Sequence, residues 1–249
     1  MGNDPLTCRL LVTICARAGS KGLPGKNMRL LNGMPLLAHT VSQAVKWQRV
    51  YCPTAKVIVS TDGDDLAKIA QCYGAEVPFR RPSYLATDKI GKLPVLTHAV
   101  EQAEKLYETR FDLVLDLDPT SPIRTDRDIN NGLNTFHRTG KQVCFSVTEP
   151  KKNPYFNVVE RNTDGCIRLV KGAANPALRR QEAQCVWDMN ASIYVYARDF
   201  LIERPKSLWD GDPEIFEMPP ESSYDIDRES DFIVTEALLS HVDRSLLIK

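Results

Sequence analysis

The chain has 249 residues, of which 43% are hydrophobic and 26% are charged, a composition typical of a soluble globular protein with one large domain. Its 32 basic and 32 acidic side chains cancel, which excludes the strong overall charge that binds nucleic acid or an anionic membrane surface. An anionic ligand must therefore be bound by a local basic cluster. No apolar run approaches the length of about 18 residues that spans a bilayer.

The N-terminal residues and the cysteines predict a cytoplasmic protein. The first residues lack the basic and then apolar pattern of a signal peptide. The 7 cysteines are odd in number, and no two of them form a Cys-x-x-Cys motif. We therefore expect reduced, structural cysteines rather than disulfides or a metal cluster.

Alternating strand and helix patterns predict an α/β domain. Short apolar runs predict core strands at 10–15, 57–59, 113–115 and 192–196. Apolar residues at helical spacing predict helices at 36–45, 66–73, 95–106 and 232–242. Strands separated by helices indicate a three-layer sandwich, in which a mostly parallel sheet has helices on both faces. Its binding loops would follow the carboxyl ends of the strands, at 16–27, 60–63 and 116–124.

This alternation stops between about residues 149 and 191. Turn sequences at 151–154, 162–165 and 175–176 flank short strand-like segments there. We expect an inserted β-rich arm that protrudes from the central layer, within a single domain spanning residues 1–249.

The segment 16–27 is the most informative part of the chain. Its small residues let backbone N–H groups approach an anion closely, and nests of such groups bind phosphate. Arg17, Lys21 and Lys26 add positive charge, and Ser20 adds a hydrogen-bond donor. The pattern is neither a Walker loop nor Gly-x-Gly-x-x-Gly. It predicts a polyphosphate site, with a solvated glycine-rich turn as the alternative.

Two carboxylates near the C-terminus predict a metal site. Asp225 and Asp227 lie two positions apart, on one face if the segment is extended. Paired carboxylates with room for water and phosphate oxygens are the usual ligands of Mg²⁺. The alternative is an acidic helix N-terminus that is capped by Asp227 or Ser230.

A second acidic cluster allows a rival interpretation. Asp116, Asp118 and Thr120 directly follow a predicted strand, with the spacing of the nucleophile loop in haloacid-dehalogenase-like phosphohydrolases, which form an aspartyl-phosphate. That motif normally opens its fold, whereas here it lies in the middle of the chain. The rival interpretation also leaves the basic loop without a role.

Several ordered motifs resemble those of the acylneuraminate cytidylyltransferases, also called CMP-sialic acid synthetases. The motifs are 17–22 with 26–27, 60–62, 81–88, 119–124, 190–194 and 225–227, and the resemblance covers about residues 9–242. It implies a fold like that of the nucleotide-diphospho-sugar transferases. It also implies transfer of CMP from CTP to the anomeric hydroxyl of a 2-keto sugar acid, with release of pyrophosphate, and an arm that packs against a second subunit in a homodimer.

The same resemblance implies roles for individual residues. The nucleotide-binding set is Arg17, Ser20, Lys21, Lys26, Asn27 and Arg81. The catalytic set is Arg17, Lys21 and Asp227, and the Mg²⁺ ligands are Asp225 and Asp227. Within the first set the loop residues hold the triphosphate, Asn27 lies near phosphate or ribose, and Arg81 faces the cytosine. One of the two carboxylates, or a water on the metal, accepts the proton of the sugar.

On the sugar side the resemblance implies the set Asp118, Thr120, Ser121, Arg180, Gln181, Asp188 and Asn190. Sialic acid enzymes usually have Gln in place of Asp118 and often Arg in place of Asp188, and a small residue often stands in place of Lys92. Carboxylate acceptors suit acetamido N–H groups. We therefore expect a diacetamido nonulosonate of the legionaminate type, with N-acetylneuraminate as the other sugar of this class. In the alternative, Asp118 and Asp188 pair with nearby Arg or Lys side chains.

Two further functions stay open. One is a 3-deoxy-manno-octulosonate cytidylyltransferase, which has a related fold and the same reaction on an eight-carbon acid. The other is a nucleotide-binding regulator without catalysis. Arg180-Gln181 and the segment 225–227 favour the nine-carbon sugar acids, and the complete charged loop and metal pair favour an enzyme.

Overall fold

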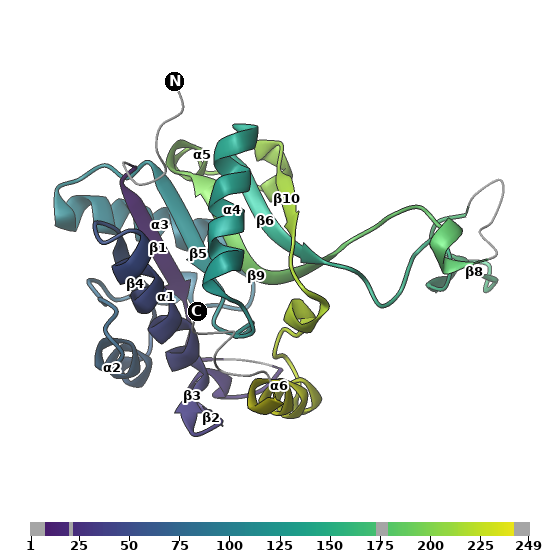
Figure 1. The fold of residues 1–249 in the computed structure, drawn as a ribbon, viewed down its shortest axis with the longest axis horizontal. Helices are drawn as coiled ribbons and strands as arrows, with labels where there is room; N and C mark the ends of the chain where they lie inside the picture. The colour runs from purple at the N-terminus through teal and green to yellow at the C-terminus, as the bar shows by residue number, and fades with distance from the viewer. Residues whose placement is uncertain (1–7, 20–21, 173–178, 242–249) are drawn as a thin grey trace.

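A six-stranded sheet forms the centre of the molecule in the computed structural model, which describes residues 8–19, 22–172 and 179–241 (Figure 1). Its strands are β1 Leu10–Cys15, β4 Lys56–Ser60, β5 Leu113–Leu117, β6 Val143–Thr148, β9 Asp188–Ala197 and β10 Glu214–Glu217. Their order across the sheet is β10-β6-β9-β5-β1-β4. Only β9 runs antiparallel to its two neighbours, so the expected mostly parallel sheet is confirmed.

Helices cover both faces of this sheet. On one face lie α1 Leu36–Tyr51, α2 Asp64–Cys72 and α4 Asp126–Thr139, and on the other lie α3 Lys92–Tyr107 and α5 Arg198–Ile202. Alternate residues of one strand serve the two layers, because Val12 packs toward the first set of helices and Leu11 toward the second. The expected three-layer sandwich is confirmed. Short 3-10 helices complete the description: η1 Lys26–Met28, η2 Ser83–Leu85, η3 Arg180–Glu182, η4 Leu208–Gly211 and η5 Pro220–Ser223.

The loops after β1, β4 and β5 meet along one edge of the sheet, here called the rim. The backbone N–H of Ala16 donates to the carbonyl of Ser60 at 3.1 Å, and that of Ala18 donates to Asp62 Oδ1 at 2.9 Å. The meeting of these loops follows from the parallel strands, whose carboxyl ends all point the same way.

The last helix brings the segment 225–227 to the rim. Helix α6, Glu229–His241, packs with the small hairpin of β2 Leu30–Leu31 and β3 Met34–Pro35 in a third apolar cluster. Ile226 is fully buried in that cluster, and its backbone N–H donates to the carbonyl of Thr120 at 2.9 Å. The residues on either side of Ile226 are thereby fixed next to the loop that follows β5.

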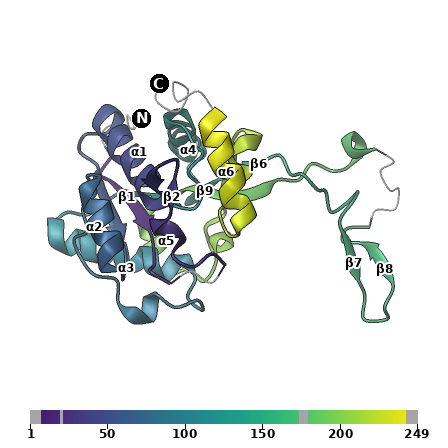
Figure 2. The ribbon, with the colours of Figure 1, turned by 90° about the horizontal axis from the view of Figure 1, so that it is seen from below.

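The expected arm protrudes far from the sandwich (Figures 1 and 2). Its tip carries an antiparallel pair, β7 Val159–Arg161 and β8 Ile167–Leu169. The predicted C-terminal boundary at residue 191 is wrong, because residues 188–191 already belong to β9. Asp188 pairs with Thr148 of β6, so the arm spans residues 149–187.

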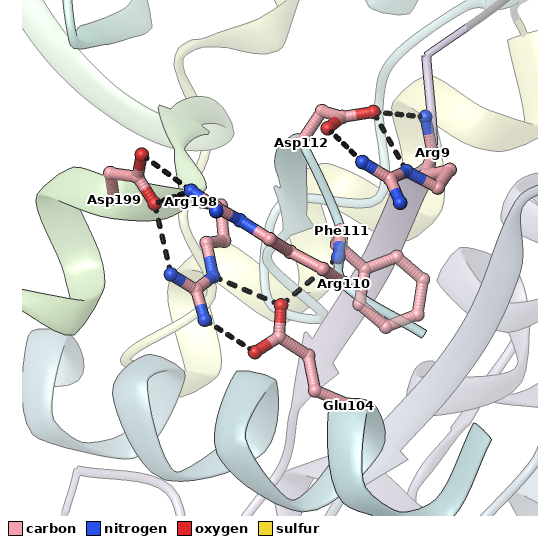
Figure 3. A network of polar contacts seen from close by, with 7 residues as sticks. All are labelled: Arg9, Glu104, Arg110, Phe111, Asp112, Arg198 and Asp199. Atoms are coloured by element: carbon pink, nitrogen blue, oxygen red, sulfur yellow. Dashed lines mark hydrogen bonds and ion pairs between the residues drawn. The ribbon is translucent and has the colours of Figure 1, made fainter. Parts of the chain in front are cut away.

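A network of charged side chains lies at the opposite end of the sheet, before β1 and β5 begin (Figure 3). Arg198 donates to both oxygens of Glu104, and Glu104 also accepts the backbone N–H of Phe111 at 3.0 Å. Beside them Arg9 donates three times to Asp112, once from its backbone N–H and twice from its guanidinium. The network ties the end of α3 and the start of α5 to the sheet. No helix in the described part of the chain is long and apolar enough to cross a membrane.

Candidate active site

Two adjoining cavities open at the rim. The first, about 260 Å³, is lined by Cys15, Arg17, Gly22, Lys26, Asn27, Asp118, Pro119, Thr120 and Asp227. The second, about 220 Å³, is lined by Cys15, Arg17, Arg81, Leu85, Thr87, Asp88, Ile90, Gly91, Lys92 and Val95. Cys15 and Arg17 line both, so the two cavities meet there. A larger cavity of about 440 Å³ lies between α1, α4 and α6, and it contains no residue of the predicted nucleotide or metal sets.

The basic loop contributes two described cations to the first cavity, and each is paired with a carboxylate. Arg17 forms an ion pair with Asp88. Lys26 is only 12% exposed, and its Nζ lies 2.8 Å from Asp227 Oδ1. Ser20 and Lys21 lie outside the described residues. A polyanion entering the cavity would therefore compete with two acids for these cations.

Two further members of the predicted nucleotide set are buried at the same rim. Asn27 donates to the carbonyl of Arg17 at 3.4 Å, and its own Oδ1 is buried without a hydrogen bond. Arg81 lines the second cavity and donates to the hydroxyl of Ser60 at 3.1 Å and to the carbonyl of Ser60. The structure therefore brings Arg17, Lys26, Asn27 and Arg81 together, as the sequence predicts.

The carboxylates of the predicted metal pair face the basic loop. Burial raises the pKa of Asp225, and the nearby charge of Asp118 raises it further. Asp227 is 69% exposed, and its carboxylate contacts Lys26. Neither Asp227 nor Ser230 caps the last helix: Asp231 accepts the backbone N–H of Asp227 at 3.1 Å. The alternative prediction, in which Asp227 or Ser230 caps the last helix, is therefore wrong.

The oxygen atoms at this point suit a hard divalent cation. Asp225 Oδ1 is buried and accepts no hydrogen bond, which leaves a lone pair that a cation would satisfy. Within the described residues no group of three or more His, Cys, Asp or Glu side chains could hold a metal ion. A cation bound here would keep water or phosphate oxygens as further ligands, which is the way Mg²⁺ is usually held.

Asp118 is paired with a lysine. Its Oδ2 accepts from Lys92 Nζ at 2.7 Å, and its Oδ1 accepts from the backbone N–H and the hydroxyl of Thr120 at 3.1 and 2.8 Å. Burial would raise the pKa of Asp118, but Lys92 and Thr120 lower it below its ordinary value. This pairing is the alternative arrangement considered for Asp118, whose contact with sugar stays a prediction.

The phosphohydrolase interpretation is wrong, because its nucleophile would be inaccessible. Asp116 is fully buried, accepts from the hydroxyl of Thr13 at 2.8 Å and forms an ion pair with Lys92 at 2.6 Å. A carboxylate whose oxygens are engaged in this way inside the sheet cannot attack a phosphate in the cavity.

The remaining members of the predicted sugar set are scattered. Ser121 and Asn190 are buried beneath the rim, where the Ser121 hydroxyl donates to the carbonyl of Asn190 and the Asn190 amide donates to the carbonyl of Ser222. Asp188 is exposed at the start of β9. Gln181 is exposed on the arm beside Arg180, whose side chain lies outside the described part, and within one chain the arm stands away from the sandwich (Figure 1).

One residue that supports the rim carries no role in the sequence-based sets. Arg124 is 1% exposed and donates to the carbonyl of Ser192 at 2.6 Å, to the hydroxyl of Thr40 at 2.7 Å and to the carbonyl of Asp118. Burial lowers its pKa to about 10, so it stays charged at neutral pH. Its place in the motif 119–124 is the only sequence signal for it.

The sandwich, with a basic loop facing two carboxylates at the carboxyl ends of parallel strands, defines a nucleotidyltransferase. More specifically, the chain belongs to the cytidylyltransferase family, whose model, described as Cytidylyltransferase, matches residues 11–240. The resemblance inferred from the motifs is thereby confirmed.

Individual relatives agree with this assignment. The chain is 37% identical over 231 residues to the CMP-N,N'-diacetyllegionaminic acid synthase of Campylobacter jejuni subsp. jejuni serotype O:2, covering 93% of this chain and 95% of that protein. It is 30% identical over 220 residues to the N-acylneuraminate cytidylyltransferase of Streptococcus agalactiae serotype V, covering 88% and 51%. A solved CMP:2-keto-3-deoxy-manno-octonic acid synthetase complexed with CTP has the same fold, with a TM-score of 0.63 at 19% identity over 93% of this chain and 98% of that one.

Proposed function

We propose that this protein transfers CMP from CTP to the anomeric hydroxyl of a nonulosonate, releasing pyrophosphate. The observation that carries the proposal is the rim itself. Arg17, Lys26 and Asp227 line a cavity of about 260 Å³ there, and Asp225 lies beside it, close enough to Asp227 and Lys26 to feel their charges. The relatives named as a diacetyllegionaminic acid synthase and an acylneuraminate cytidylyltransferase indicate the class of sugar acid.

The two cavities suit the two halves of CTP. The triphosphate lies in the first cavity, where Arg17, Ser20, Lys21 and Lys26 bind it and Asn27 lies near it. The cytosine lies in the second cavity, where Arg81 faces it. Phosphate oxygens replace Asp88 and Asp227 as the partners of the basic loop, because several charged oxygens outweigh one carboxylate for each cation.

Asp225 and Asp227 hold Mg²⁺, with Asp225 contributing the buried oxygen that lacks a hydrogen bond. When bound, the ion neutralises charge on the phosphate oxygens and helps to orient the reacting groups. The anomeric oxygen forms a bond to the α-phosphorus, and the bond from that phosphorus to pyrophosphate breaks. The proton of the hydroxyl passes to one of the two carboxylates or to water. Arg17, Lys21 and Lys26 stabilise the charge on the leaving pyrophosphate.

The arm completes the site from a second subunit in a homodimer. A pair of three-residue strands is too small to be stable alone, and the arm exposes Val159, Ile167 and Trp187 in one chain. Packing against a partner buries these side chains and brings Arg180 and Gln181 to the partner's cavities. Sedimentation analysis of a micromolar solution tests this arrangement, and a monomeric mass would contradict it.

The sugar is a diacetamido nonulosonate of the legionaminate type, with N-acetylneuraminate as a weaker substrate. Asp188 is exposed on β9 and has a carboxylate free to accept acetamido N–H groups in the assembled site. Thr120 lines the first cavity and stands next to Asp118, while Ser121 and Asn190 support the same loop from beneath. All of this takes place in the cytoplasm, where CTP is available.

A pyrophosphate-release assay tests the proposal. Purified protein is supplied with CTP, Mg²⁺ and, in turn, a diacetamido nonulosonate, N-acetylneuraminate and 3-deoxy-manno-octulosonate. We expect release that requires both CTP and sugar, with the highest kcat/KM for the diacetamido sugar. Asp227→Asn should keep the fold and slow turnover by about 10²-fold. Release with CTP alone, or a preference for the eight-carbon acid, would contradict the proposal.

A further inference from the structure

Lys92 lies in the wall of the second cavity, and its ion pair reaches toward the first. It is the first residue of α3 and lines the second cavity, whereas its partner Asp118 lines the first. The contact of 2.7 Å between Lys92 Nζ and Asp118 Oδ2 therefore forms part of the wall between the two cavities. A nucleotide that occupies both would have its α-phosphate beside this pair.

A lysine is costly at this position. The N-terminus of a helix is the positive end of its dipole, so a cation there is unfavourable. Burial on its own lowers the pKa of Lys92, but the carboxylates of Asp116 and Asp118 raise it well above its ordinary value. Burial raises the pKa of the neighbouring Cys15 and Tyr194 to about 12, so both are neutral. Two acids hold the ammonium in place, and the ring of Tyr194 lies 5.2 Å from Lys92 Nζ as a further favourable contact.

The pair connects to the predicted metal ligands through a short series of contacts. Asp118 accepts from Lys92 on one oxygen and from the backbone and hydroxyl of Thr120 on the other. The carbonyl of Thr120 in turn accepts the backbone N–H of Ile226 at 2.9 Å. Ile226 lies between the two carboxylates that face the basic loop. Thr120 therefore links the position of Asp118 to that of the segment 225–227.

We infer that Lys92 is a positioning residue that acts through Asp118 to hold Thr120 and the segment 225–227 in register with the nucleotide. Lys92 and Asp118, which both depart from the family pattern, then act together as one ion pair. Replacing Asp118 alone leaves Lys92 with Asp116 only, so the two residues have to be changed together to learn what either does. The inference rests on the proposed function and names a device within the same site.

The test is a double-mutant cycle with Lys92→Met, Asp118→Asn and the combination, measured in the pyrophosphate-release assay alongside thermal unfolding. Arg198→Met is the matched control, because its ion pair with Glu104 lies at the far end of the sheet (Figure 3). The two pairs are buried to a similar extent: the side chains of Arg198 and Glu104 are 19% and 17% exposed, and those of Lys92 and Asp118 are 28% and 20% exposed. The control should lower the melting temperature and leave kcat unchanged per folded molecule.

Lys92→Met should lower kcat at saturating substrates by about tenfold or more per folded molecule. In the Asp118→Asn background the same change should alter kcat by less than about threefold, because the contact through which Lys92 acts is already absent there. If Lys92→Met alone does not fold, a change of more than about threefold in the Asp118→Asn background still overturns the inference. Losses that multiply would mean that Lys92 acts without Asp118, and a kcat of Lys92→Met within about twofold of wild type would remove the role altogether.

The activity of the wild-type protein distinguishes failure of the proposed function from failure of this inference. Absence of pyrophosphate release by wild type with every sugar acid would overturn the proposed function and this inference with it. Normal release by wild type, combined with either contrary result in the cycle, would overturn the inference alone.

Discussion

Gly22 lies in the basic loop at a place where no side chain fits. A Cβ added there would lie 2.5 Å from the carbonyl oxygen of Asp227, whereas ordinary contacts begin at 3.4 Å. Because the obstacle is backbone, no side-chain rotation relieves it, and Gly22→Ala has to separate the loop from the segment 225–227 by roughly 1 Å. That separation lengthens the contact between Lys26 and Asp227, which is 2.8 Å in the wild type.

A displacement of about 1 Å in groups that position a substrate costs about 10²-fold in rate. We therefore expect Gly22→Ala to lower kcat/KM for CTP by about 10²-fold, equivalent to about 2.7 kcal/mol, in the pyrophosphate-release assay. Arg198→Met is again the control, because its ion pair with Glu104 lies at the far end of the sheet from this loop. If Gly22→Ala keeps kcat/KM within about threefold of wild type, the close approach of the two segments has no part in binding or turnover.

Three other predictions concern stability. Burial and a neighbouring carboxylate raise the pKa of Asp225, so its ionised form destabilises the fold at neutral pH. Asp225→Asn should therefore raise the melting temperature in metal-free buffer while slowing turnover by about 10²-fold. A lower melting temperature at neutral pH would contradict this. Burial lowers the pKa of His98 and His137, so the unfolded chain binds protons more readily than the folded one. The free energy of unfolding should therefore fall as the pH drops from about 6.5 through the lowered pKa values of the folded protein. Equal urea midpoints at about pH 7.5 and 5.5 would argue against this. Gly132→Ala places a methyl group 2.9 Å from the ring of Phe216, so it should destabilise the fold by about 1–3 kcal/mol, and an unchanged denaturation midpoint would show that the core adjusts freely.

The elements that the sequence predicts are those whose pattern is local. The strands β1, β4 and β5 are short apolar runs bounded by turn residues, and α1 and α3 carry apolar residues at helical spacing. Their boundaries differ from the structure by a few residues, because the helices continue into polar residues that periodicity does not count.

Other elements escape this pattern. Helix α4 is largely polar, and its clearest sequence signal is the capping box formed by Thr125 and Asp128. Strand β10, Glu214–Glu217, lies at the edge of the sheet and is short and charged at both ends. Pairing with β6 holds β10 in the sheet, and α4 packs against it so closely that the ring of Phe216 leaves no room for a Cβ at Gly132.

The sequence by itself determines the class of chemistry. A glycine-rich basic loop after the first strand and a pair of carboxylates before the last helix are local patterns of residue types, and they predict phosphate and cation binding before the fold is known. The order of strands and helices then places the three loops on one rim, because parallel strands end on the same side.

Only the tertiary structure decides what each carboxylate does. Lys26 and Asp227 are 201 positions apart, and Lys92 and Asp118 are 26 apart, so no local pattern reveals that they meet. Asp116 is fully buried and pairs with Thr13 and Lys92. Asp231 accepts the backbone N–H of Arg228 at the start of α6, and Asp225 is partly buried near the charges of Asp118 and Asp227, although all three look alike in the sequence. The physical reason is that the role of an acid depends on its burial and on the charges and donors around it, and here the long-range packing of the chain supplies those neighbours.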